Sequence, residues 1–359
     1  MPEIRIRRIR TKAKNEAGKT EDYQVLPCFV MPYMTGYTED VEKALFLHFN
    51  YEVPFDGLVY VFGRDVSYWY RMSQHLGHYS LAGCTAKTPE QLPEDVAADE
   101  KHTSWNGSKA YIATTVGEGC FWGAAISLGA DEASLSEAYG VFKEESQTIK
   151  QDYEPKTANT DGFTSTLKAW MTLFLSTILS RCFLHGFINI RNQAKRQPVF
   201  RELAEKVWDV YQQSSYHDFI NQLTLLQWWA HKQQDNMTER CFNAVMKLCL
   251  HAHSYAKAYD HPNCHRTSNM LDRLMQKMDR YLFMMRYFHG HLHSAELSIR
   301  AWALAQNFLP YCSRSPTRKD FISPVHKLNG TVYRDNWLEN LLVSASLSGR
   351  HKRTHIPLE

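Results

Sequence analysis

The stretch PKTANTDGFTSTLKAWMTLFLSTILSRCFLH, residues 155–185, decides the fold. It predicts a short strand that ends at Asp161 in a Thr-Asp-Gly turn, then an amphipathic helix and a second short strand. An aspartate at the carboxyl end of a strand in an α/β layer is a common metal ligand, although Asp-Gly is also an ordinary turn. The apolar residues of the helix recur at the spacing of one buried stripe, formed by Phe163, Leu167, Trp170, Met171 and Phe174.

Three more strands are expected before this stretch. The first is a short apolar run, 96–99, that ends in an aspartate, and the next two, 109–116 and 121–128, are joined by a turn at 117–119. The order β-β-β-α-β-α-β, an antiparallel meander followed by parallel strands, is that of an RNase H-like (retroviral-integrase-like) α/β fold. The helix after the third strand is expected to bury the face formed by Leu135, Ala138, Tyr139 and Phe142.

The rest of the chain is expected to form a helical insertion, the last helix of the catalytic domain and a C-terminal tail. Residues 186–262 are almost entirely helical in pattern, and we interpret them as an all-helical insertion after the fifth strand. The RNase H-like catalytic domain is therefore expected over 92–310, and a C-terminal basic tail over 311–359, where 337–342 would form a short docking helix. The last helix of the catalytic domain follows Asn269 and is expected to bury Leu271, Leu274, Met275, Met278, Leu282 and Met285.

Residues 36–83 predict a small helical domain that resembles a helix-turn-helix. Thr38 is the expected N-cap of its first helix, and Pro54 opens the second, which ends at Gly63. The third helix would be the recognition helix and would offer Arg64 and Arg71 to DNA. A trihelical module with no DNA-binding role has the same pattern.

Composition and charge exclude several classes of protein. The chain is 44% hydrophobic and 22% charged, which is typical of a globular protein and not of a disordered one. Its 8 cysteines include no C-x-x-C pair, which argues against a zinc ribbon or disulfide scaffold and favours a reducing compartment. There is no signal-peptide pattern or apolar run long enough for a membrane span, so we expect a cytoplasmic protein.

The positive charges gather at the two ends of the chain, although the net charge is only +3. Residues 1–35 are expected to form a basic N-terminal arm that either seeks phosphate or is simply solvated. The cations concerned are Arg5, Arg7, Arg8, Arg10, Lys12, Lys14 and Lys19 at the start, and Arg350, Lys352 and Arg353 at the end.

Three acids occupy the positions that two-metal phosphodiester chemistry requires: Asp99, Asp161 and Asp272. Two divalent cations stabilise the attacking and the leaving oxygen, and Mg²⁺ or Mn²⁺ prefers carboxylate ligands. Glu100 is expected on the opposite face of its strand, because side chains alternate. Asp279 and Glu296 are the alternatives for the third acid.

Cations and aromatic residues near these acids have two interpretations each. Arg273, Lys277 and Arg280 follow one another at i, i+4 and i+7 beside Asp272, where they either contact a DNA backbone or form a solvated face. The pair Trp228-Trp229 can stack on a base, but packing in the core of the insertion is the favoured interpretation. The alternating histidines at 289, 291 and 293 lack partners at metal-binding spacing, so no transition-metal site is expected there.

The motifs in this order resemble those of DDE transposases of bacterial insertion sequences in the Mutator-like (MULE) superfamily. The resemblance covers about 95–310 and includes a C-x-x-H motif, Cys182 and His185, between the second and third acids. It departs from the family at Asp272, where a glutamate is usual and the side chain is one methylene shorter. The matching segments are ADEKH (98–102), YIATTV (111–116), NTDG (159–162), CFLH (182–185) and TSNMLDR (267–273).

This resemblance implies a polynucleotidyl transferase that uses two Mg²⁺ (or Mn²⁺) ions. It implies cleavage and strand transfer at the terminal inverted repeats of a mobile element, with double-stranded DNA as partner and a homo-oligomer on the DNA. Cys182 and His185 are expected to brace the active site or to lie near the scissile strand. The alternatives are an inactive, transposase-derived DNA-binding regulator and a structure-specific nuclease of the same fold.

Overall fold

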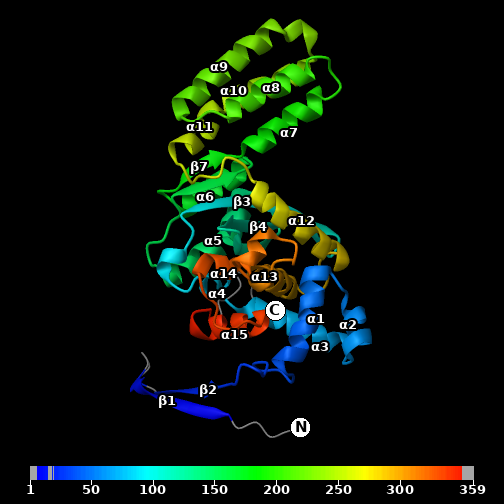
Figure 1. The fold of residues 1–359 in the computed structure, drawn as a ribbon, viewed down its shortest axis with the longest axis vertical. Helices are drawn as coiled ribbons and strands as arrows, with labels where there is room; N and C mark the ends of the chain where they lie inside the picture. The colour runs from blue at the N-terminus through cyan, green and yellow to red at the C-terminus, as the bar shows by residue number, and fades with distance from the viewer. Residues whose placement is uncertain (1–5, 15–17, 19, 350–359) are drawn as a thin grey trace.

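A five-stranded mixed sheet lies at the centre of the protein in the computed structural model, which describes residues 6–14, 18 and 20–349 (Figure 1). The strand order is β5-β4-β3-β6-β7. The first three strands pair antiparallel, and β6 and β7 join in parallel, as the sequence predicts. The strands are β3 (Asp95–Trp105), β4 (Ser108–Gly117), β5 (Cys120–Ser127), β6 (Thr157–Thr160) and β7 (Ile178–Arg181).

The central strand β3 separates two hydrophobic cores. It is much longer than the predicted run 96–99, because it pairs with β4 as far as Trp105. Val96 and Ala98 pack against α5 (Glu132–Ile149) and α6 (Thr164–Leu173), whereas Ala97 packs on the opposite face with α12 (Asn269–Met284) and α13 (Leu292–Phe308). This alternation follows from the two-residue period of a strand.

The buried face of α6 differs from the predicted stripe. Thr166, Ala169 and Trp170 are buried, but Phe163 and Met171 are 42% and 61% exposed. The reason is that the helix begins only at Thr164 and turns its face toward α5. By contrast, the predicted faces of α5 and α12 are confirmed, with Leu274 and Met285 half-buried at the margin of the α12 face.

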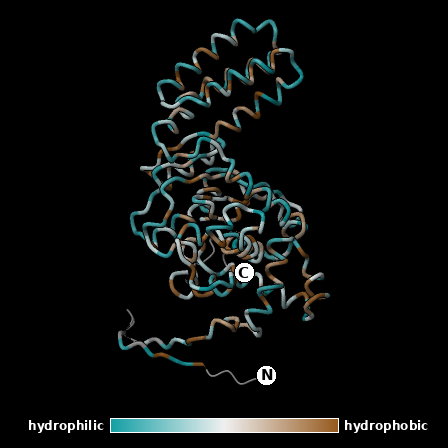
Figure 2. Tube along the Cα trace, in the orientation of Figure 1, coloured by the Kyte–Doolittle hydropathy of each residue, from teal (hydrophilic) through white to brown (hydrophobic). Residues whose placement is uncertain are grey.

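The segment predicted to be an all-helical insertion is helical and forms a lobe with its own core at one end of the molecule (Figure 1). It begins at Phe183 and not at 186, because α7 starts directly after β7 and Cys182. The hydropathy of its trace alternates along the helices, as expected for amphipathic segments (Figure 2). Its helices are α7 (Phe183–Ala194), α8 (Phe200–Tyr211), α9 (Tyr216–Lys232), α10 (Glu239–Leu250) and α11 (Ala252–Asp260).

The N-terminal helices lie where they were predicted but share a core with the sheet. Thr38 is not an N-cap: it is the first residue of its helix, and its Oγ1 donates to the carbonyl of Cys28 at 2.7 Å. Gln74 donates from Nε2 to the Ser294 carbonyl, which joins the third helix to α13. The helices are α1 (Thr38–Tyr51), α2 (Phe55–Phe62), α3 (Val66–His75) and the short α4 (Leu81–Thr85).

Residues 311–349, which were expected to belong to a basic tail, are largely folded. They form α14 (Pro324–Asn329) and α15 (Trp337–Leu347), which includes the predicted helix 337–342. Trp337, Leu338 and Leu341 are buried in the core shared with the sheet, so burial of apolar area holds this segment in place. Arg350, Lys352 and Arg353 lie outside the described residues.

The basic N-terminal arm contains a β-hairpin that the sequence analysis did not predict. Strands β1 (Arg7–Lys14) and β2 (Thr20–Val25) pair antiparallel and extend away from the body, on the side opposite to the insertion (Figure 1). Arg10 pairs with Asp22 across the hairpin, with 2.7 Å between Nε and Oδ1. Arg7, Arg8 and Lys12 are exposed, whereas Arg5 and Lys19 lie outside the described residues.

The edge strand β5 is covered by polar side chains of α13. Glu296 accepts a hydrogen bond from the Ile126 amide at 2.7 Å, and the Asn307 side chain both accepts from the Phe121 amide and donates to its carbonyl. These bonds satisfy backbone groups that an edge strand would otherwise leave unpaired. Among the described residues, no helix has the length and apolarity needed to cross a bilayer.

A buried ion pair ties α5 to α13 beside this edge. Glu145 and Arg300 are each 1% exposed and form an ion pair. Glu145 also accepts from Ser80 Oγ at 3.0 Å and from the Ala82 amide at 3.1 Å. Arg300 donates to the carbonyl of Gly77 at 3.2 Å, so the pair fixes the segment that enters α4 as well.

We expect Glu145→Gln to lower the free energy of unfolding by about 3–5 kcal/mol, because it leaves the buried charge of Arg300 without a counter-ion. Urea unfolding followed by circular dichroism measures the change. Glu144→Gln, one position away and exposed on the same helix, is the matched control and should lie within about 0.5 kcal/mol of wild type. Equal stability of the two variants would contradict the structural role of the pair.

A second prediction concerns acid stability. His48 is completely buried, its Nδ1 donates to the Val53 carbonyl at 2.9 Å, and burial lowers its pKa from 6.5 to about 4. As the pH falls, His48 is therefore protonated in the unfolded chain before it is protonated in the folded protein. Its contribution to the free energy of unfolding is complete above pH 6.5 and is lost as the pH falls toward 4. The loss from His48 between pH 7 and pH 5 should be about 2 kcal/mol.

His48→Gln should remove this part of the pH dependence while keeping a donor for Val53. Unfolding free energies of the variant and of wild type at the two pH values give the difference. His217→Gln, exposed on α9, is the control and should keep the wild-type dependence. If the free energy of unfolding of His48→Gln fell between pH 7 and pH 5 by as much as that of wild type, His48 would not be the source of the pH dependence.

Candidate metal centre

Three potential ligands from distant parts of the chain meet beside the middle of β3, near the point where the neighbouring parallel strand β6 ends. Asp99 lies on β3, His185 in the first turn of α7 and Asp272 in the first turn of α12. One ligand atom of each lies within 4.8 Å of the others, and all three side chains are half-buried. Within residues 6–14, 18 and 20–349 this is the one group of three such ligands.

Local structure explains how the three residues come together. The Cys182 amide donates to the Thr160 carbonyl, and the Phe183 amide donates to the Arg266 carbonyl at 3.0 Å. The start of α7 is thereby bonded both to the end of β6 and to the segment that leads into α12. His185, two residues farther on, consequently faces the end of the sheet from the first helical turn.

Cys182 also connects α7 to Asp272. Its sulfur accepts from the Ser268 amide at 3.2 Å, and its thiol lies 3.3 Å from Ser268 Oγ. Ser268 Oγ in turn donates to Asp272 Oδ2 at 3.0 Å. The C-x-x-H motif therefore contributes to the site twice, with His185 as a potential ligand and Cys182 as a support for the third acid.

Asp161 lies beside this group and not within it. It directly follows β6, and its Oδ1 accepts from the Phe163 amide at 2.7 Å in a tight turn. It lines the same cavity as His185, and its negative charge contributes to the raised pKa of Asp99. Of the three predicted acids, the structure thus brings Asp99 and Asp272 into one ligand group and places Asp161 next to them.

The electrostatics of the site favour a cation between the carboxylates. Burial, and then the charges of Asp161 and Glu100, raise the pKa of Asp99 to about 7. The pKa of His185 is raised to about 9, chiefly by interaction with the Cys182 sulfur. The charges of Asp99 and Asp272 also raise it, whereas burial lowers it. An imidazolium balances the acids in this arrangement, and a divalent cation can do the same in its place.

The donor set fits a divalent metal ion. Two carboxylates suit Mg²⁺ and Mn²⁺, and an imidazole suits Mn²⁺ better than Mg²⁺. His185 Nδ1 is buried and has no hydrogen-bond partner among the described residues. A buried nitrogen without a partner, on a side chain grouped with two carboxylates, fits a ligand position.

The alternative acids have other partners. Glu100 faces α5 and α6, as predicted, and accepts from Tyr139 and Thr166 at 2.5 and 2.7 Å. Glu296, the alternative third acid, is completely buried at the edge of β5. Asp279 forms an ion pair with Lys101 at 2.5 Å.

The predicted DNA-binding cations are spread over two surfaces. Arg64 and Arg71 are exposed at the start and on the outer face of α3, and Arg64 lies over the Tyr68 ring. On α12, Arg273 and Lys277 are exposed, but Arg280 pairs with Glu52, the residue after α1, at 3.2 Å. None of the five lines the cavity beside the acids.

The two tryptophans of the insertion have different environments. Trp229 packs against the core of the insertion, and its Nε1 donates to Glu202 at 2.8 Å. Core packing was also the favoured interpretation for Trp228, but this was wrong, because its side chain is 68% exposed on α9. The helical period places adjacent residues on different faces.

Arg181 is a cation of the site that was not predicted from the sequence. It ends β7 immediately before Cys182 and lines the cavity together with Asp161 and His185. Its place in the sequence, at the carboxyl end of a parallel strand, was the available signal, because ligand sites gather at this edge of such sheets.

Comparison of the sequence with protein-family models and with curated proteins finds no match.

We expect Mn²⁺ to bind the group, and Ser268→Ala to weaken this binding about 10-fold, because the variant removes the hydroxyl that orients Asp272. Asp272→Ala should weaken it further. Isothermal titration calorimetry or the loss of the free-Mn²⁺ electron paramagnetic resonance signal gives the affinity. Asp279→Asn, on the same helix but paired with Lys101, is the control; wild-type affinity in Asp272→Ala would exclude this group as the metal site.

Proposed function

We propose that the protein is a metal-dependent DNA-cleaving and strand-transferring enzyme, a DDE-type transposase with an RNase H-like catalytic domain. The observation that carries this proposal is the meeting of Asp99, His185 and Asp272. Those residues come from the central strand, the helix after the fifth strand and the helix after the insertion. The strand order β5-β4-β3-β6-β7 and the resemblance in motif order support it.

The residues of the site have distinct roles in this proposal. Asp99, His185 and Asp272 hold one divalent ion, and Asp161 contributes to a second. Such a pair of Mg²⁺ or Mn²⁺ ions supplies charge stabilisation at the attacking and leaving oxygens of a phosphodiester. Ser268 and Cys182 keep Asp272 in position, which lets an aspartate serve where the resembling family has a glutamate.

Two exposed basic elements support DNA as the partner. The β1–β2 hairpin carries Arg7, Arg8 and Lys12 on a two-stranded ribbon, a shape that the major groove of B-DNA can admit. Arg64 and Arg71 of the α1–α3 unit present further cations. We propose that these elements bind the terminal inverted repeats of a mobile element in the nucleoid, with two or more copies of the chain on paired ends.

The test is Mg²⁺- or Mn²⁺-dependent cleavage of a supercoiled plasmid that carries the DNA flanking this gene. We expect end-specific cutting by wild type, and a loss of at least about 100-fold in Asp161→Asn, because the metal-binding carboxylate is neutralised without a change of shape. Asp152→Asn, exposed in the segment before β6, is the control. Tight binding to the ends by both proteins, without cutting by either, would instead identify a DNA-binding regulator.

A further inference from the structure

A cavity of about 340 Å³ lies beside the metal centre, where the sheet meets the helical insertion. Asp161 and Arg181 line it from the carboxyl ends of β6 and β7, and His185 from α7. It is also lined by Lys247 of α10 and by His251, which lies between α10 and α11. The cavity is therefore shared by the sheet and the insertion.

Three basic side chains converge on this cavity. The Arg181 guanidinium lies directly over Gly162: a Cβ atom on this glycine would come within 2.6 Å of the guanidinium nitrogen. The pKa of His251 is lowered by burial and then by the neighbouring charges of Arg181 and Lys247, which places all three close together. Within the described part of the chain, neither Arg181 nor Lys247 has a carboxylate within ion-pair distance.

Close packing fixes the wall that carries two of these groups. Gly186, in the first turn of α7, faces Leu248 and Tyr255, and a Cβ there would lie 2.8 Å from Leu248 Cδ1. The glycine therefore lets α10 and α11 approach α7 closely. This approach brings Lys247 and His251 to the cavity.

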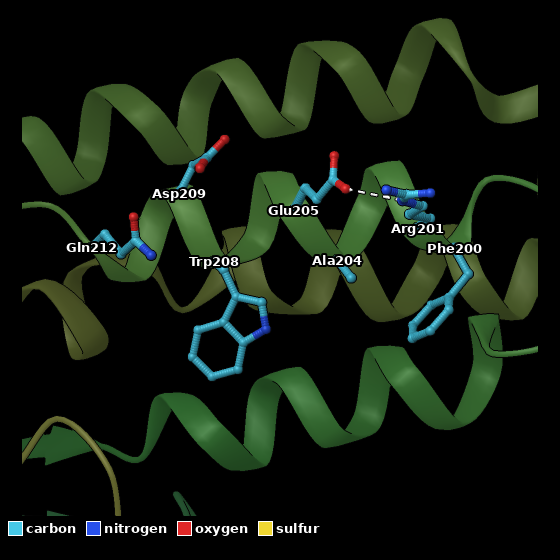
Figure 3. Close-up of a pocket in the computed structure, with 7 residues that line it drawn as sticks. All are labelled: Phe200, Arg201, Ala204, Glu205, Trp208, Asp209 and Gln212. Carbon is cyan, nitrogen blue, oxygen red and sulfur yellow. Dashed lines mark hydrogen bonds and ion pairs between the residues drawn. The ribbon is translucent and has the colours of Figure 1, made fainter.

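Arg201 on α8 is a cation of the insertion that lies outside this cavity and has an acidic partner. It lines a separate groove on the surface of the insertion and pairs with Glu205, one turn away, at 3.3 Å (Figure 3). Its charge is thus matched within the same helix. The cations of the shared cavity are not matched in this way, so their positive charge is available to an anion.

From this arrangement we infer that Arg181, Lys247 and His251 form a binding site for a backbone phosphate of a single DNA strand, next to the metal centre. The inference rests on the proposed function for the identity of the anion. The cavity is too small for a duplex, whereas one phosphodiester group fits beside Asp161 and His185. It gives the insertion a role in binding the substrate, because Lys247 and His251 belong to it.

The experiment measures the affinity of a fluorescently labelled single-stranded oligonucleotide for the full chain at several salt concentrations, without divalent metal. In Arg181→Gln/Lys247→Gln we expect affinity to fall at least about 10-fold, and the slope of log Kobs against log salt to decrease by about 0.7, because one phosphate is no longer neutralised. Arg201→Gln is the control and should keep the wild-type slope. Arg181→Lys should also keep the slope, which separates loss of charge from misfolding.

An unchanged slope in the double variant, or no binding of the oligonucleotide by wild type, would overturn the inference. The result is separable from the proposed function. If wild type cuts the plasmid but the double variant binds with the wild-type slope, only the phosphate site is wrong. If no protein cuts, but the double variant loses affinity and slope as expected, the phosphate site stands and the enzyme assignment fails.

Discussion

The two-residue period of the central strand β3 is the constraint on which both the core and the candidate site depend. β3 is bonded on both sides, to β4 and β6, and covered on both faces. Its side chains must therefore alternate between two hydrophobic cores. In the middle of the strand this alternation directs Asp99 toward α12, and Glu100 toward Tyr139 and Thr166 on the other face. A shift of one residue would exchange the two acids.

The junction between the sheet and the insertion brings further side chains to Asp99. α7 begins as soon as β7 ends, so the C-x-x-H motif places Cys182 on the sheet side of the junction and His185 one turn into the helix. Cys182 then supports Ser268 and, through it, Asp272. The same junction starts the lobe whose α10 returns Lys247 to the cavity. The ligand group and the basic wall above it are thus consequences of one strand-to-helix transition.

Strong local patterns made much of the fold predictable. The meander, the strand before Asp161, the insertion and the buried face of α12 all follow from runs of apolar residues at strand or helix spacing. Weaker patterns failed where tertiary contacts decide. Phe163 and Met171 have the right spacing for burial, but α5 covers the other side of their short helix. Residues 311–349 have many polar side chains, yet Trp337, Leu338 and Leu341 suffice to anchor α15 in the core.

The sequence by itself determined the order of strands and helices and the residue types available at their ends, because periodicity and turn chemistry are local properties of the chain. It also indicated Asp99 and Asp272, which lie at positions set by that order. Only the tertiary structure decided that His185 joins these two acids and that Asp161 lies beside them. It also decided that Glu296 accepts a hydrogen bond from the edge strand β5. Those outcomes depend on distances between segments far apart in the chain. Packing of α7, α12 and α13 around the sheet sets these distances, and no local pattern encodes them.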